Sequence, residues 1–118
     1  MIKGIGIDIV EIARISSGIE RKVLSEKEIS IFNNFKGEHR KKEFIAGRFS
    51  VKEALIKAVG AFISYKKITI LNDENGKPYF DDETLKYIKN KFGDCIIHLS
   101  ISHEKNYAVS IVVIERID

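Results

Sequence analysis

Residues 44–59 set one carboxylate among three cations. The charged residues are Arg48, Lys52, Glu53 and Lys57, and the rest of the run is mostly apolar. Arg48 and Lys52 are four residues apart, so on a helix they would be neighbours and repel each other. Such a pair in a largely buried helix indicates an anion between the two cations. A carboxylate beside cations also suits a metal-bound phosphate, because the carboxylate holds the metal and the cations hold the phosphate oxygens.

A simpler interpretation exists for Glu53 and Lys57. They are i,i+4 neighbours, and an exposed helical pair of this kind stabilises by about 0.2–0.5 kcal/mol without any ligand. This helix alone therefore leaves two alternatives open, a metal-and-phosphate site or a surface ion pair.

The N-terminal segment supplies a second carboxylate, Asp8. Residues 2–10 alternate, with isoleucines on one face and Gly4, Gly6 and Asp8 on the other. Glycine weakens a strand unless something approaches the backbone closely, so this face is a candidate ligand surface. Asp8 followed by Glu11 also resembles a capping box that opens a helix. Both interpretations of Asp8, ligand and cap, stay open.

The elements that must position these groups follow from periodicity and turn residues. In chain order they are a strand over 2–10, a short helix over 11–19, a helix after the Ser25–Glu28 capping box, a long helix from Glu38 to Gly60, two strands around an Asn75-Gly76 hairpin, a helix ending at Gly93, and strands over 95–102 and 107–114. Strands and helices without regular alternation predict an α+β fold, here as one domain over 1–118. The last strand is apolar on both faces, which predicts a central or interface position.

Composition narrows the function classes. The 118 residues are 44% hydrophobic and carry a net charge of +3, which fits a polyanionic substrate or an acidic partner but does not by itself indicate nucleic acid. Cys95 is the only cysteine, so the chain has no intrachain disulfide and no thiolate metal cluster. We find no secretory signal and no apolar run of membrane length, so we expect a cytoplasmic protein.

Four motifs together resemble the holo-[acyl-carrier-protein] synthase family, the short stand-alone 4'-phosphopantetheinyl transferases. The motifs are Gly4-Ile5-Gly6-Ile7-Asp8-Ile9-Val10-Glu11, Gly47-Arg48-Phe49-Ser50-Val51-Lys52-Glu53-Ala54-Leu55-Ile56-Lys57-Ala58, Asn75-Gly76-Lys77-Pro78 and Ser100-Ile101-Ser102-His103. Each is moderately specific, but all four in this order are highly specific and span nearly the whole chain. The resemblance implies a small, mainly antiparallel sheet packed with a long central helix, and a homotrimer with active sites between subunits.

The resemblance also implies a reaction. The 4'-phosphopantetheine arm of coenzyme A moves to a serine of apo-acyl carrier protein for fatty acid biosynthesis, and adenosine 3',5'-bisphosphate leaves. The family uses Mg²⁺, which usually takes one or two protein carboxylates together with phosphate and water. The expected partners are therefore coenzyme A and apo-acyl carrier protein, without nucleic acid or membrane.

The resemblance also implies roles for individual residues. Asp8 and Glu53 match the family's metal-binding positions. Lys57 matches a lysine beside the pyrophosphate, where it would stabilise developing charge. Glu53 is also the expected base for the carrier serine, directly or through a metal-bound water, and the sequence does not separate these routes.

Further matched positions concern the two substrates. Arg48, Lys52 and His103 match coenzyme A contacts, where cations or hydrogen-bond donors meet phosphate oxygens. Arg14 is the best match within the expected docking surface for the acidic carrier protein, ahead of the other basic residues near it. The chain departs from the family at residues 60–67, a shorter segment with a single glycine. That departure leaves the contacts to the adenine and the 3'-phosphate open.

Two other function classes compete with the transferase. A small basic RNA-binding domain is disfavoured because the chain lacks an aromatic RNP-type segment and a G-x-x-G loop. A non-catalytic module that only binds carrier protein would not need Asp8, Glu53 and Lys57 together.

Overall fold

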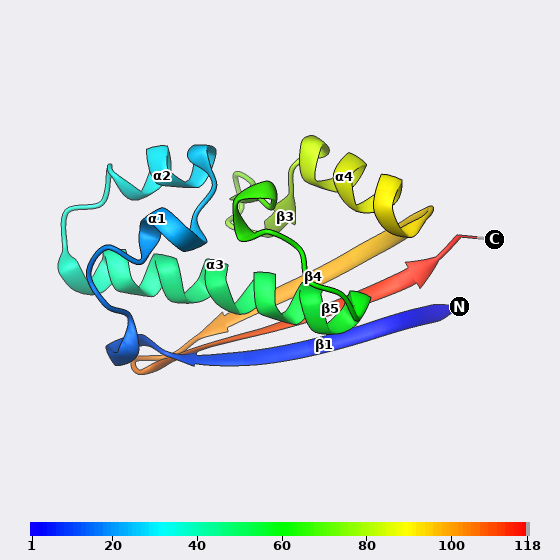
Figure 1. Cartoon of the computed structure of the whole chain (residues 1–118). Coiled ribbons are helices and arrows are strands. Elements are labelled where there is room, and N and C mark those ends of the chain that lie inside the picture. Colours follow the sequence, from blue (N-terminus) through cyan, green and yellow to red (C-terminus); the bar gives the residue numbers. More distant parts are fainter. Residues whose placement is uncertain (118) are drawn as a thin grey trace.

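The computed structural model describes residues 1–117 and has an α+β architecture with a sheet on one side and helices on the other (Figure 1). The main sheet is antiparallel with the order β1-β5-β4, built from β1 (Ile2–Glu11), β5 (Tyr107–Arg116) and β4 (Cys95–His103). The predicted α+β class and the central position of the last strand are confirmed. Because β5 is central, β1 and β4 form opposite edges of the sheet.

The long helix α3 (Glu38–Val59) lies across the inner face of this sheet, as Figure 1 shows. Gly4 and Gly6 permit this packing, because a Cβ at either position would overlap the carbonyl oxygen of Ala58 or Ala54. The close approach predicted at these glycines is therefore made by α3, and the ligand surface expected there is a helix–strand contact.

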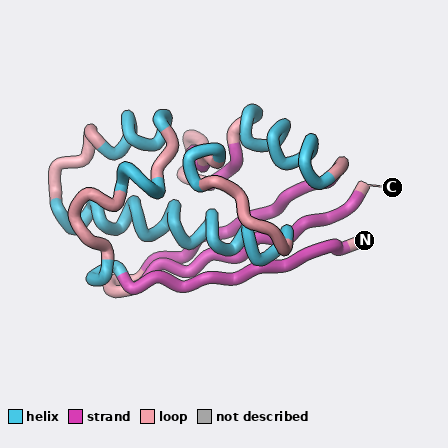
Figure 2. The backbone as a smooth tube through the Cα atoms, viewed as in Figure 1, coloured by secondary structure: helices cyan, strands magenta, loops and turns pink. Residues whose placement is uncertain are grey.

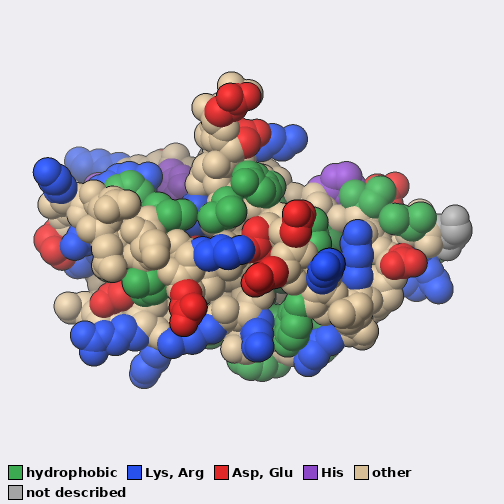
Figure 3. Space-filling view, turned by 90° about the horizontal axis from the view of Figure 1, so that it is seen from above, with side chains coloured by type: hydrophobic (Ala, Val, Ile, Leu, Met, Phe, Trp, Pro, Cys, Tyr) green, Lys and Arg blue, Asp and Glu red, His purple; other side chains and the backbone are tan. Residues whose placement is uncertain are grey.

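Apart from η1 (Ile12–Arg14), which lies at the end of β1, the other elements form a second layer on the helical side of the molecule (Figure 2). They are α1 (Glu20–Val23), α2 (Glu26–Phe32), η2 (Tyr65–Lys67), β2 (Ile70–Asn72), β3 (Pro78–Phe80) and α4 (Asp82–Phe92). Strands β2 and β3 pair as the predicted hairpin. Seen from the helical side, Lys and Arg side chains are interspersed with acidic and hydrophobic ones (Figure 3). This face is therefore mixed in charge.

Local signals set the element ends where they were predicted. Ser25 and Glu28 form both hydrogen bonds of a capping box at the start of α2. Gly60 ends α3 with a φ of 80°, a left-handed conformation that glycine adopts without a Cβ penalty. The hairpin turn likewise places Gly76 at a φ of 85°.

The predicted helix over 11–19 is wrong. Strand β1 continues to Glu11, which pairs with Tyr107, and the amide of Ile12 donates to the carbonyl of Asn106 at 2.8 Å. Pairing with β5 thus satisfies the backbone groups that a helix would have needed, and only the short turn η1 follows. Asp8 lies inside the strand and caps no helix.

The two faces of the sheet differ in how far other elements cover them. The inner face packs against α3, and Val51, Leu55 and Val112 are fully buried there. On the outer face of β1, Ile5, Ile7 and Ile9 are 63%, 60% and 61% exposed. Within residues 1–117, no helix is both long and apolar enough to cross a membrane.

Candidate functional site

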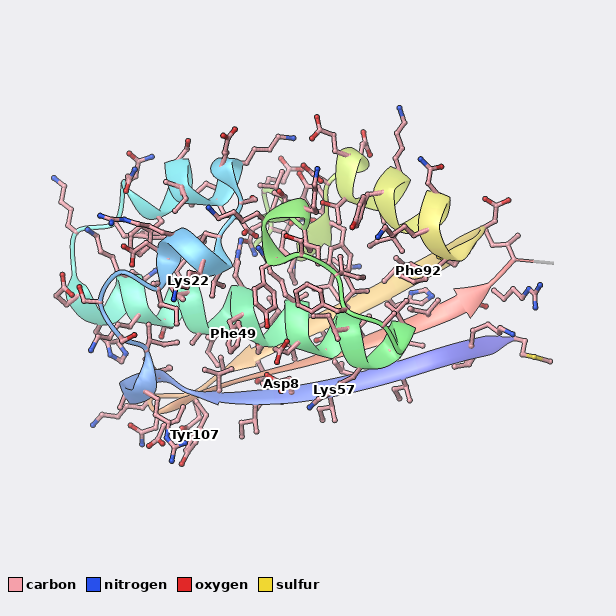
Figure 4. The ribbon with its side chains drawn as sticks, in the orientation of Figure 1. Asp8, Lys22, Phe49, Lys57, Phe92 and Tyr107 are labelled. Carbon is pink, nitrogen blue, oxygen red and sulfur yellow. The ribbon has the colours of Figure 1, made fainter. Side chains whose placement is uncertain are left out.

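A groove of about 520 Å³ brings the two predicted metal-binding carboxylates together. Asp8 lines it from β1 and Glu53 lines it from α3, with Phe49 of α3 and Tyr107 of β5 completing part of the wall. Figure 4 shows Asp8 and Lys57 side by side between β1 and α3, with Phe49 farther along the helix. The strand and the helix therefore hold acidic groups that are 45 positions apart in sequence at one hollow.

Lys57 is tied to the strand side of this groove. Its Nζ lies 3.2 Å from Oδ1 of Asp8 and donates to the carbonyl of Ile7 at 2.9 Å. The side chain of Lys57 is more than half exposed, so its ammonium also remains open to a ligand. The ion pair of Lys57 is thus formed with Asp8 and not with Glu53, which disfavours the simple i,i+4 interpretation.

Glu53 accepts a hydrogen bond that the sequence did not reveal. The hydroxyl of Tyr65 in η2 donates to Oε2 of Glu53 at 3.0 Å. Burial raises the pKa of Tyr65, and the hydrogen bond to Glu53 raises it further. The phenol is therefore protonated at neutral pH and can only donate to the carboxylate. The sequence showed that residues 60–67 depart from the family pattern, but it gave no indication that Tyr65 contacts Glu53.

The anion predicted between Arg48 and Lys52 is present, and it belongs to the chain itself. The Nζ of Lys52 lies 2.5 Å from Oε1 of Glu28, and Nε of Arg48 lies 4.0 Å from Oε2 of the same carboxylate. Glu28 also accepts from the amide of Ile70 at 2.8 Å. In the buried cluster, defined here as Glu28, Arg48 and Lys52, the two cations therefore share one carboxylate that the chain itself supplies.

Lys52 does not reach a ligand site in this structure. Its side chain is 0% exposed, and besides Glu28 its ammonium donates to the carbonyls of Val23 at 2.8 Å and Tyr65 at 3.0 Å. These three acceptors use its whole donor capacity. The prediction that Lys52 contacts coenzyme A is therefore corrected to a role in holding α1, α2 and η2 on α3. Burial lowers the pKa of Lys52, and Glu28 opposes that effect.

Arg48 is also buried, on the flank of α3 that faces the β2–β3 hairpin. Its Nη2 donates to the carbonyl of Ile70 at 3.1 Å and to Oδ1 of Asn72 at 2.6 Å, and its guanidinium lies over the ring of Phe44. Burial lowers the pKa of Arg48 to about 10, so the group stays cationic at neutral pH. Among the described residues, its Nε is the one buried side-chain nitrogen or oxygen without a hydrogen-bond partner.

His103 lies at the end of β4, on the sheet edge opposite Asp8. Its ring covers Gly47 of α3, where an added Cβ would lie 2.8 Å from Nε2. Partial burial lowers the pKa of His103, which favours the neutral imidazole. A neutral imidazole has one donor and one acceptor nitrogen, which suits a hydrogen bond to phosphate.

The predicted residues therefore fall into two groups within one chain. Asp8, Glu53 and Lys57 lie at the β1 edge, whereas Arg48 and His103 lie on the other side of α3. Glu53 and Arg48 are about 140° apart around the helix at 3.6 residues per turn. One chain does not bring all the predicted residues to one groove.

Arg14 stands at the rim of the groove that holds Asp8 and Glu53. It belongs to η1, its side chain is largely exposed, and its Nε pairs with Oε1 of Glu11 at 3.0 Å. An exposed ion pair of this kind contributes little to stability and exchanges readily for another anion. The position of Arg14 therefore fits contact with an acidic partner that approaches the groove.

The two carboxylates are a suitable donor set for Mg²⁺ but not for a metal held by protein alone. No group of three or more His, Cys, Asp or Glu side chains that could hold a metal occurs among residues 1–117. Mg²⁺ commonly binds one or two carboxylates and completes its shell with substrate phosphates and water. Asp8 and Glu53 fit that pattern because they face one open groove beside a cation.

Comparison with known proteins identifies relatives over the full chain. A family model described as the 4'-phosphopantetheinyl transferase superfamily matches residues 4–112. A holo-[acyl-carrier-protein] synthase from Petrotoga mobilis is 51% identical over 97% of both chains. The crystal structure of a holo-(acyl-carrier-protein) synthase from Bacillus anthracis in complex with CoA (3',5'-ADP) has a TM-score of 0.81 at 42% identity, covering 98% of this chain and 97% of that one. The Neisseria meningitidis holo-[acyl-carrier-protein] synthase structure has a TM-score of 0.82 at 31% identity, covering 98% of this chain and 100% of that one.

Proposed function

The chain belongs to the 4'-phosphopantetheinyl transferase superfamily, as an enzyme of the holo-[acyl-carrier-protein] synthase type, and from this premise we propose how its residues perform the reaction. The enzyme transfers 4'-phosphopantetheine from coenzyme A to apo-acyl carrier protein. The relatives' shared name and the coenzyme A complex of the Bacillus anthracis protein support this activity. The observation that carries the residue assignment is the shared groove of Asp8 and Glu53, with Lys57 bound to Asp8.

We propose that Asp8 and Glu53 hold Mg²⁺ together with the pyrophosphate of coenzyme A. The bound ion would neutralise charge on the phosphate oxygens. Lys57 sits beside Asp8 with its ammonium partly exposed, so it can bind a pyrophosphate oxygen and stabilise charge that develops on the leaving group.

Glu53 is the proposed base for the carrier serine. The serine hydroxyl attacks the phosphorus that bears the pantetheine arm, the phosphorus–oxygen bond to adenosine 3',5'-bisphosphate breaks, and the serine proton is transferred to a base. Glu53 is suited to this because its carboxylate lines the groove whose rim carries Arg14. Arg14 would bring the acidic carrier protein to this rim, mainly by accelerating encounter.

We further propose that the enzyme is a trimer in which each site uses two chains. His103 lies on the sheet edge opposite Asp8, so it reaches coenzyme A only at the groove of a neighbouring copy. The exposed isoleucines on the outer face of β1 offer an apolar surface for that contact. Arg48 is a weaker candidate than His103 because its guanidinium is already bonded inside the chain.

Mixing two inactive variants tests this arrangement. Glu53→Gln and His103→Ala each remove a residue from every site of a homotrimer. If subunits are exchanged, about a quarter of the sites in a random mixture combine an intact Glu53 with an intact His103 from the neighbour. We expect activity to reappear in the mixture. Mixed oligomers confirmed by mass spectrometry that remain inactive would contradict the shared site.

We propose that the product, a carrier protein with phosphopantetheine on its serine, serves fatty acid biosynthesis. The cytoplasmic location expected from the sequence stays a prediction.

A further inference from the structure

We propose that Tyr65 is a positioning residue that fixes the carboxylate of Glu53 through its hydroxyl. This inference rests on the proposed function of Glu53. The hydroxyl of Tyr65 lies 3.0 Å from Oε2 of Glu53, and this is a direct link between the shortened segment after α3 and the groove. With Oε2 engaged, the carboxylate cannot rotate freely, and Oε1 is left for the ligand side.

The Tyr65 ring is itself held in place. It meets the ring of Phe49 edge-on, with centroids 5.6 Å apart, and the ring of Phe62 at 5.9 Å. Contacts between aromatic edges and faces favour one ring orientation. Phe49 lines the same groove as Glu53, so the ring contact and the hydroxyl contact act at one wall.

The backbone of Tyr65 is anchored by the buried cluster. The ammonium of Lys52 donates to the carbonyl of Tyr65 at 3.0 Å, and Lys52 is in turn paired with Glu28. Lys52 also holds the carbonyl of Val23 at the end of α1. A fully buried ion pair thus fixes the backbone at Tyr65. The hydroxyl of the same residue then restrains the carboxylate of Glu53.

Groups that orient a metal-binding carboxylate affect affinity although they do not touch the metal. Their loss typically costs about 10–100-fold in metal affinity or activity. A tyrosine is suited to this task here because its hydroxyl donates to the carboxylate of Glu53 while its ring packs against Phe49. The segment at residues 60–67, short as it is, would thereby contribute to the site through Tyr65.

The variant Tyr65→Phe tests the inference, because it removes only the hydroxyl and keeps the ring. Tyr79→Phe is the matched control, since it removes the same group from a half-exposed tyrosine on β3, away from the groove. In the metal-free protein, the three-bond NMR couplings of the Glu53 side chain should show one rotamer in the wild type and in Tyr79→Phe, but averaged rotamers in Tyr65→Phe. Unchanged couplings in a folded Tyr65→Phe protein would overturn the proposal.

A second measurement connects the orientation to function. Mg²⁺ is titrated calorimetrically into the protein saturated with coenzyme A, without carrier protein. Tyr65→Phe should bind Mg²⁺ at least roughly tenfold more weakly than the wild type. The turnover number should fall in parallel, with the KM for carrier protein unchanged. Mg²⁺ affinity and turnover equal to those of Tyr79→Phe would also overturn the proposal. Failure of the wild type to bind Mg²⁺ or transfer the group would instead contradict the proposed function, while the metal-free couplings would still decide whether Tyr65 orients Glu53.

Discussion

At the scale of single residues, the site depends on how each charge is partnered. Asp8 and Lys57 form an open pair at the groove, whereas Lys52 gives all its hydrogen bonds to groups inside the chain. An exposed pair can exchange one partner for a phosphate at little cost, but a buried pair cannot without leaving an uncompensated charge. This difference separates Lys57, which we propose binds the pyrophosphate, from Lys52, which is bonded only inside the chain.

His103 gives a prediction for the pH dependence of stability. Burial lowers its pKa in the folded state below the 6.5 of the unfolded chain. The unfolded chain therefore binds the proton more readily as the pH falls. The stability that depends on neutral His103 is fully present above pH 6.5 and declines as the pH drops from there to the folded pKa. Urea unfolding at about pH 8 and about pH 5 should show a smaller loss of stability in His103→Gln than in the wild type. Equal losses in both proteins would show that His103 is not the group responsible.

The sequence predicted the positions of some of these residues better than others. Asp8, Glu53 and Lys57 lie in strong local motifs, and the structure brings them to one place. The interpretation of Lys52 failed because its partner, Glu28, is 24 positions away and also belongs to a capping box. Periodicity showed that Lys52 needed an anion, but it carried no information on which anion. Tyr65 was missed for the same reason, since only the folded chain places it against Glu53.

At the scale of elements, the buried cluster joins α1, α2, η2 and β2 to α3. Glu28 starts α2 through its capping box, pairs with Lys52 of α3, and accepts from the amide of Ile70 in β2. Each contact replaces water around a charge with a fixed partner, so the cluster specifies one arrangement of these elements. The elements were predicted correctly at the Ser25–Glu28 capping box, at Gly60, at the Asn75-Gly76 turn and at Gly93. The helix over 11–19 was wrong because pairing with β5 outweighed a weak local pattern.

Replacing Lys52 with methionine tests the structural role of this cluster. Lys52→Met keeps most of the volume but removes the cation closest to the buried Glu28 and leaves only Arg48 at 4.0 Å, so the free energy of unfolding should fall by about 3–5 kcal/mol. The double variant Lys52→Met with Glu28→Gln should recover part of this loss, because it also removes the buried charge that has lost its closest partner. Urea unfolding followed by circular dichroism measures both. A loss below about 1 kcal/mol in the single variant, typical of an exposed pair, would contradict the structural role.

At the scale of the whole molecule, the outer face of the sheet is the feature that one chain leaves unexplained. Ile5, Ile7 and Ile9 form an exposed apolar row on β1, and Ile111 on the neighbouring strand β5 adds to it. The alternation that predicted this strand also predicted the row, but not what covers it. The predicted site residues are divided between two edges of the sheet. Association with other copies of the chain would bring the two groups together, and it would also cover the apolar row.

A charge placed in this row should prevent assembly. Ile7→Lys would bury an ammonium in the proposed interface, whereas Phe92→Lys adds the same charge on α4 at a half-exposed position on the helical side. We expect multi-angle light scattering at micromolar concentration to show a trimer for the wild type and Phe92→Lys, and a smaller species without activity for Ile7→Lys. An active Ile7→Lys monomer would contradict the shared site.

The central claim is that phosphopantetheine transfer depends on the carboxylates of Asp8 and Glu53. Intact mass spectrometry of the carrier protein tests this claim most directly. Apo-acyl carrier protein is incubated with the enzyme, coenzyme A and Mg²⁺, beside a chelator control and the Glu53→Gln variant. We predict that the carrier gains one phosphopantetheine on its serine, that chelation abolishes the gain, and that Glu53→Gln slows it by about 10²–10⁴-fold without loss of fold. No gain with a folded wild-type enzyme, or an undiminished gain with Glu53→Gln, would contradict the account.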